Sequence, residues 1–136
     1  MDISLGLRSL LFVGGFVISS CALIDTYVDA PGVDIERIAT TTGSIASASF
    51  MEDRYGFYLR GSVRPRSINK IPLSGHIDIA ITGPDGASTK CMTTRHRNPP
   101  RKVRRPFFVR FEKLPEPGSV VRVWHHGGAI HNGCVT

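Results

Sequence analysis

Apolar and polar residues alternate at every second position through much of the chain. The apolar positions of the four clearest segments are Tyr55, Phe57, Leu59, Gly61 and Val63; Ile77, Ile79 and Ile81; Phe107, Val109 and Phe111; and Val121 and Val123. Successive side chains of a strand point to opposite faces, so this period predicts strands that are buried on one face. Two further strands are predicted at 44–50 and 89–94.

Proline and glycine separate the predicted strands, as in 83–86 and 114–118. Proline presets φ and glycine accepts the left-handed conformation, so these segments favour turns. Short strands without an amphipathic helix predict an all-β fold, a small antiparallel β-sandwich. The order of Gly61-Ser62-Val63, Ile77 to Ile81 and Phe107 to Phe111, followed by Leu114-Pro115 and a last strand, loosely resembles transthyretin-like or immunoglobulin-like secreted modules. This likeness concerns the fold alone.

The N-terminal segment has the layout of a secretory signal. Arg8 is the one basic residue before an apolar stretch from Leu10 to Ile18, which small residues follow. A helix needs roughly 20 apolar residues to cross the hydrocarbon core, and this stretch has about half of them. We therefore expect residues 1–20 to be a cleaved signal peptide, residues 21–37 a tether and residues 38–136 the folded domain.

The end of this segment, Ile18-Ser19-Ser20-Cys21, resembles the lipobox of bacterial lipoproteins. The resemblance covers the leader alone. It implies that Cys21 carries diacylglycerol, that the leader is cut before it and that the new amino terminus is acylated. Ala22 follows, where Asp would indicate retention in the inner membrane of enteric bacteria, so an outer-membrane anchor facing the periplasm is favoured. An ordinary signal peptide cut near Cys21-Ala22, or an uncleaved anchor, is the alternative.

Two cysteines, Cys91 and Cys134, remain when Cys21 is set aside. In an oxidising compartment an even number of cysteines is most simply explained by disulfide pairing. On the chain-entropy model, a loop of this length contributes about 4 kcal/mol to stability. We therefore expect one disulfide that fastens the C-terminus to the middle of the domain, with Cys134 as a metal ligand as the alternative.

Residues 95–106 form the most basic stretch of a chain whose formal net charge is +6, and they include no acid. Their three prolines keep the stretch extended and outside a central strand. Arginine suits two-pronged contacts with phosphate and carboxylate, so we expect binding to lipid phosphates, peptidoglycan carboxylates or an acidic protein. A solvated loop that protects a sheet edge is the alternative. Nucleic acid is not an expected partner of an exported protein. The predicted contact residues are Arg95, Arg97, Arg101, Lys102, Arg104 and Arg105.

Three histidines, His125, His126 and His131, lie with Cys134 in a glycine-rich C-terminal segment. Imidazole and thiolate groups suit copper or zinc. However, His125 and His126 point to opposite faces if the strand continues, and a disulfide would remove Cys134 as a ligand. The histidines that could then contribute are His126, His131 and either His76 or His96. We therefore predict no cofactor and no metal, and keep a copper or zinc binder of the envelope as the alternative.

Sequence motifs of a catalytic site are absent, including Gly-x-Ser-x-Gly and His-Glu-x-x-His. His76 and Asp78 share a strand face and could be combined with one of many serines into a triad, but neighbouring residue types do not establish geometry. We therefore predict a protein of the cell envelope that is not an enzyme and acts as a binding or scaffolding module through its basic loop. An accessory of a cell-wall hydrolase is a further alternative.

Overall fold

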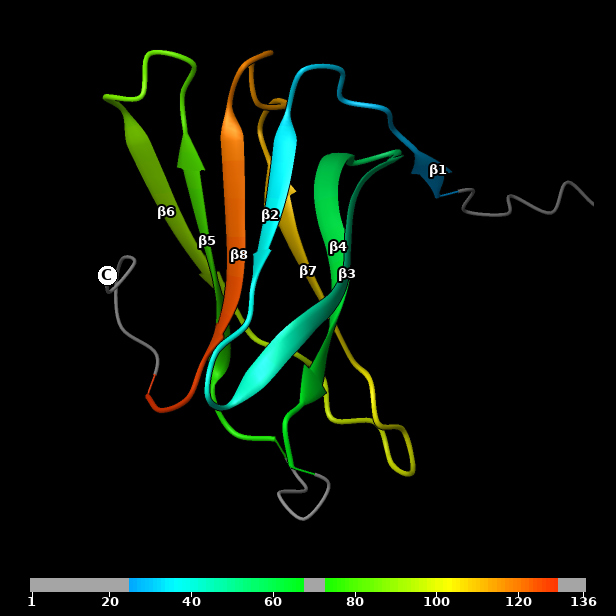
Figure 1. Cartoon of the computed structure of the whole chain (residues 1–136). Helices are drawn as coiled ribbons and strands as arrows, with labels where there is room; N and C mark the ends of the chain where they lie inside the picture. The colour runs from blue at the N-terminus through cyan, green and yellow to red at the C-terminus, as the bar shows by residue number, and fades with distance from the viewer. Residues whose placement is uncertain (1–24, 68–72, 130–136) are drawn as a thin grey trace, which may run out of the picture.

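Two packed four-stranded β-sheets make up the computed structural model, which describes residues 25–67 and 73–129 (Figure 1). The first sheet has the strand order β1-β3-β4-β7 and the second β2-β8-β5-β6. The strands are β1 (Thr26–Tyr27), β2 (Asp34–Ile38), β3 (Gly43–Asp53), β4 (Gly56–Pro65), β5 (His76–Thr82), β6 (Thr89–Thr94), β7 (Arg105–Phe111) and β8 (Val120–His126). The predicted all-β, two-sheet architecture is confirmed. In the described ranges, no stretch forms a helix long and apolar enough to cross a membrane.

The core lies between the two sheets and is built from the alternating apolar residues. Leu59 and Val63 of β4 meet Ile77 and Ile79 of β5 there, and all four are fully buried. The other buried core residues are Ile45, Phe50, Leu73, Phe107, Phe111, Val121 and Val123. Interdigitating side chains from two inner faces are the usual core of a sandwich, and the period-two pattern identified most of these residues. The prediction is wrong for Tyr55, which lies in the turn before β4 and is 65% exposed, and for Tyr58, which was placed on the polar face but is buried.

One strand pair departs from the predicted antiparallel arrangement, because β2 runs parallel to β8. Antiparallel neighbours are often joined by a short hairpin, whereas parallel neighbours need a long connection. Strands β3 to β7 lie between β2 and β8 in the chain, which is long enough for parallel pairing. A purely antiparallel sandwich is therefore wrong at this pair, while the other paired strands are antiparallel.

The sheets begin earlier in the chain than residue 38. β1 pairs with the end of β3, and β2 lies beside β8 along its whole length, within the segment expected to be a tether. Val33 and Ile35 pack against the core, which explains why this short segment is held in place. The leader, residues 1–20, lies outside the described residues, as does Cys21.

Close packing at Gly61 fixes the centre of the first sheet. Gly61 of β4 is in register with Phe107 of β7. A Cβ atom at Gly61 would overlap the ring of Phe107 and the backbone carbonyl oxygen of Ser47. The absence of a side chain therefore lets the aromatic ring lie across the strand.

Candidate functional site

A hollow of about 380 Å³ lies on the outer face of the first sheet, and we call it the basic hollow. β4 and β7 are paired there, with Tyr58 opposite Arg110 and Arg60 opposite Phe108. The segment that follows β6 adds Arg95 and Arg97. The residues that line the hollow are Asp25, Asp53, Tyr58, Arg60, Arg95, Arg97, Pro106, Phe107, Phe108 and Arg110. Four arginines from three chain segments thus converge with two aspartates.

Two of these arginines are paired with the aspartates. Arg110 donates two hydrogen bonds to the carboxylate of Asp53, at 3.0 and 2.7 Å. The Nη1 atom of Arg60 lies 3.9 Å from Oδ2 of Asp25. The hydrogen bond from Arg110 lowers the pKa of Asp53, and the same bond raises the pKa of Arg110. No acid in the described part of the chain forms an ion pair with Arg95 or Arg97. The hollow therefore has a surplus of positive charge.

Aromatic rings lie beside these charges. Phe108 is 47% exposed although its neighbour Phe107 is buried. The guanidinium of Arg97 lies 5.9 Å from the centre of the Phe108 ring, and that of Arg110 lies 5.4 Å from the centre of the Tyr58 ring. These are cation–π distances. The hollow thus offers forked donors for an anionic group next to an apolar surface.

The predicted basic loop divides into three parts. Arg95 and Arg97 line the hollow, whereas Arg101, Lys102 and Arg104 are exposed outside it. Arg105 is only 2% exposed, and its Nη1 donates hydrogen bonds to the carbonyl of Pro99, at 2.9 Å, and to that of Lys102. Arg105 therefore holds the loop together from inside, and we leave it out of the contact surface.

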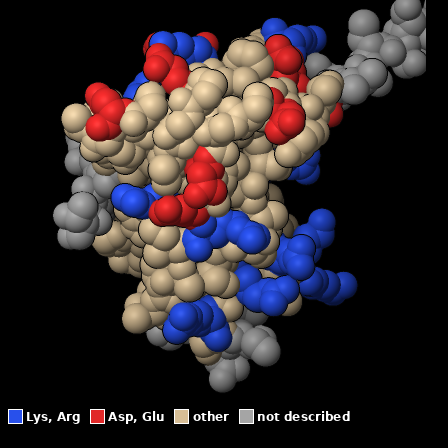
Figure 2. Space-filling view, turned by 45° about the horizontal axis from the view of Figure 1, so that its top comes forward, with Lys and Arg blue, Asp and Glu red and all other residues tan. Residues whose placement is uncertain are grey.

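The charges are unevenly distributed over the face drawn in Figure 2. Lys and Arg side chains predominate toward the right and the bottom of this view, and most of the acidic side chains lie near its top and centre.

Arg60 and Arg110 were not predicted as contact residues from the sequence, because only the pairing of β4 with β7 brings them beside Arg95 and Arg97. The available signal was the polar face of the two alternating segments.

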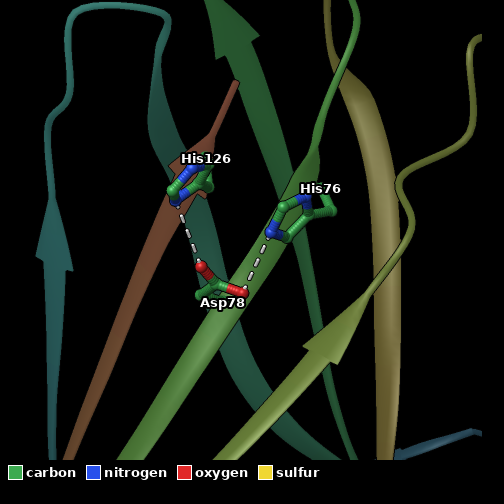
Figure 3. A group of neighbouring side chains, drawn as sticks. All are labelled: His76, Asp78 and His126. Carbon is green, nitrogen blue, oxygen red and sulfur yellow. Dashed lines mark ion pairs between the residues drawn. The ribbon is translucent and has the colours of Figure 1, made fainter. Parts of the chain in front are cut away.

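A second group of polar side chains lies on the other sheet, on the face opposite to the core residues Ile77 and Ile79 (Figure 3). We call His76, Asp78 and His126 the histidine–aspartate cluster. His76 and Asp78 come from β5, and His126 comes from β8, in register with His76. The imidazole rings of His76 and His126 are stacked, with their centres 5.0 Å apart.

His125 points into the sandwich, away from the histidine–aspartate cluster. Its Nδ1 shares a hydrogen bond of 2.7 Å with Thr42 Oγ1, and its ring lies 5.5 Å from that of His96. Burial lowers the pKa of His125 to about 4, and burial also lowers the pKa of His96. Both rings are thus neutral at pH 7, and the expected separation of His125 from His126 holds in the structure.

Most of the remaining predicted residues lie outside the part of the chain that the structure describes. Cys91 lies on β6, but Cys134 lies outside the described residues, so the disulfide stays a prediction. His131 also lies outside them, as does the lipidation candidate Cys21. Comparison of the chain with protein-family models, curated proteins and solved structures gave no match.

Proposed function

We propose that this chain is a lipid-anchored protein of the cell envelope that binds an anionic envelope component in its basic hollow. The observation that carries the proposal is the convergence of Arg60, Arg95, Arg97 and Arg110 around one hollow with an exposed aromatic ring. Guanidinium groups in such an arrangement suit phosphate or carboxylate groups, and binding either group requires no catalysis.

The predicted anchor would hold the hollow close to a charged surface. Asp25 lines the hollow, and Cys21 is four residues before it. Four residues span at most about 14 Å in any conformation. This fully extended limit is about one and a half Debye lengths of about 8–10 Å at ordinary ionic strength. Less extended conformations of the four residues would bring the hollow within one Debye length of lipid phosphates in the same membrane. We therefore propose phosphate-bearing headgroups as the first anion to test.

The anchor also raises the effective concentration of the partner. A tethered domain meets a membrane component repeatedly, so contacts that are weak in free solution become occupied. Each basic residue near an anionic membrane contributes about 1 kcal/mol. Arg95 and Arg97 carry the surplus charge of the hollow and would together contribute about 2 kcal/mol, which supports weak, reversible recognition of the headgroups at an anchored domain.

Sedimentation with lipid vesicles tests the hollow directly. The mature chain carrying Cys21→Ser is used, so that no acyl chain contributes to binding. We expect it to bind vesicles of anionic phospholipid and not vesicles of neutral phospholipid. Reversal of two charges in the double variant Arg95→Glu and Arg97→Glu should weaken binding by at least about 30-fold, equivalent to about 2 kcal/mol.

A matched control separates the hollow from the loop's general charge. Arg101→Glu with Arg104→Glu makes the same change of net charge on exposed residues outside the hollow. This control should retain most of the binding. Equal losses in the two double variants, or no loss in either, would refute the hollow as the contact surface. Binding to purified peptidoglycan but not to anionic vesicles would assign the anion to the cell wall.

Intact mass of the native protein tests the anchor and the cysteines together. We expect a chain that begins at Cys21, carries acyl groups and is two hydrogens lighter through a disulfide between Cys91 and Cys134. A product that begins at Met1 with three free thiols would contradict both parts. Such a result leaves the vesicle measurement intact, because that measurement uses the chain without its lipid.

A further inference from the structure

The histidine–aspartate cluster brings three metal-binding groups to one place. On β5, His76 and Asp78 are two residues apart and therefore share a face. On the neighbouring strand, His126 is in register with His76. One potential ligand atom from each residue lies within 4.8 Å of the others. Neighbouring strands, and not a flexible loop, hold all three residues (Figure 3).

Each histidine nitrogen of the cluster lies beside a different oxygen of Asp78, and each separation is one that two ligands of a single ion can have. His76 Nε2 lies 3.3 Å from Asp78 Oδ1, and His126 Nδ1 lies 3.6 Å from Asp78 Oδ2. Nitrogen and oxygen ligands lie about 2.0–2.2 Å from zinc, so two of them are about 3.3–3.6 Å apart in a tetrahedral site. Direct N–H···O hydrogen bonds are usually shorter, about 2.7–3.2 Å.

The burial of Asp78 calls for a positive charge. Its side chain is fully buried, and a carboxylate without a partner is costly in such a position. Thr93 Oγ1 donates a hydrogen bond of 2.9 Å to Asp78 Oδ1. Within the described part of the chain, no group donates a hydrogen bond to Asp78 Oδ2. A cation bound at this oxygen would neutralise the charge, with Thr93 orienting the carboxylate from behind.

We propose that His76, Asp78 and His126 bind one divalent transition-metal ion of the zinc and copper class. Two imidazole nitrogens and one carboxylate oxygen match these ions, whereas calcium and magnesium prefer oxygen ligands. Three protein ligands leave a coordination position for water or another donor. The side chain of His126 is 31% exposed, so an ion can reach the site from solvent.

The site differs from the one that the sequence indicated. His126 is common to both, and so is His76, which the sequence offered with His96 as an alternative. The neighbouring His125 is instead turned into the sandwich and bonded to Thr42. The proposal does not depend on the basic hollow, which lies on the other sheet. Failure of vesicle binding would therefore leave the metal site unaffected, and the reverse is also true.

A competing explanation is a purely structural cluster in which a protonated histidine neutralises Asp78. Such a cluster would bind no ion. Calorimetry separates the two explanations, using the untagged mature chain with Cys21→Ser, stripped with a chelator and titrated with zinc and, separately, with copper. We expect saturable binding of one ion per chain, and nitrogen coupling in the electron paramagnetic resonance spectrum of the copper-loaded protein.

Two variants and a matched control identify the ligands. His126→Ala and Asp78→Asn should each weaken metal binding at least about tenfold, the lower limit seen even for indirect contacts to a metal site. Arg122→Ala changes an exposed residue of the same strand that is no part of the cluster, and its affinity should stay within about twofold of the parent. If Asp78→Asn fails to fold, the partly exposed His126 provides the decisive variant.

Three outcomes would overturn the proposal. The first is no saturable binding of either ion. The second is unchanged binding by His126→Ala. The third is complete loss of binding by His131→Ala while His126→Ala retains it, which would assign the ion to the C-terminal segment. Loss of nitrogen coupling in His126→Ala, with the fold preserved, would instead support the assignment.

Discussion

Replacing Gly61 with alanine should destabilise the protein by about 2 kcal/mol. The added methyl group would overlap the Phe107 ring and the carbonyl oxygen of Ser47. Overpacking costs about 1–3 kcal/mol, and we expect the upper end because a backbone carbonyl cannot rotate away. The lower entropy of the unfolded alanine chain offsets about 0.4–1 kcal/mol. For a domain of this size, the midpoint of thermal unfolding should fall by about 8 °C.

Urea unfolding measures this change, followed by the fluorescence of Trp124, the one tryptophan of the chain. The midpoint should fall while the slope of the transition stays the same. Arg60→Ala, at the adjacent position with its side chain exposed, serves as the control and should change stability by less than about 0.5 kcal/mol. Combining Gly61→Ala with Phe107→Leu should recover at least about 0.5 kcal/mol relative to additivity. A Gly61→Ala protein as stable as its parent would refute the packing argument.

Three other predictions concern buried polar groups. Arg105→Lys should lower the free energy of unfolding by about 2–3 kcal/mol in urea, because the shorter lysine side chain does not reach the position of Nη1, which donates both hydrogen bonds to the loop. Weaker vesicle binding at unchanged stability would instead make Arg105 a contact residue. Thr42→Val should cost about 1–2 kcal/mol by removing the partner of His125, whereas the exposed neighbour Thr41→Val should be nearly neutral in the same assay. Burial lowers the pKa of His125 to about 4 and lowers that of His96, so the unfolded chain binds more protons than the folded chain below about pH 6.5. The free energy of unfolding of the chelator-treated protein should therefore be full above about pH 6.5 and about 2 kcal/mol lower at about pH 5. Equal urea midpoints at pH 7 and pH 5 would contradict this.

The strands that the sequence predicted most clearly are those with one apolar face. Ile77 and Ile79, for example, alternate with polar residues and are fully buried in the core. β1 and β2 were missed because they are short and largely exposed, so their burial pattern has no clear period. The parallel pairing of β2 with β8 depends on contacts between distant parts of the chain, about which local alternation gives no information.

The sites follow the same division. Arg95 and Arg97 were predicted because the basic stretch is continuous in sequence, whereas Arg60 and Arg110 join them only through the register of β4 and β7. The sequence grouped His125, His126 and His131 by their proximity along the chain and offered His76 or His96 only as a further ligand. The structure groups His126 with residues of β5, because pairing between strands brings together residues that are far apart in sequence.

The place of β8 in the second sheet has a consequence for how the protein is made. Among the described residues, β8 is the last strand, and it lies between β2 and β5 in its sheet. Its Arg122 pairs with Glu36 of β2, 86 residues earlier. Contacts at such separation form slowly, and β2 and β5 both lack this neighbour until β8 has been synthesised. A nascent chain therefore cannot complete its second sheet before β8 is available.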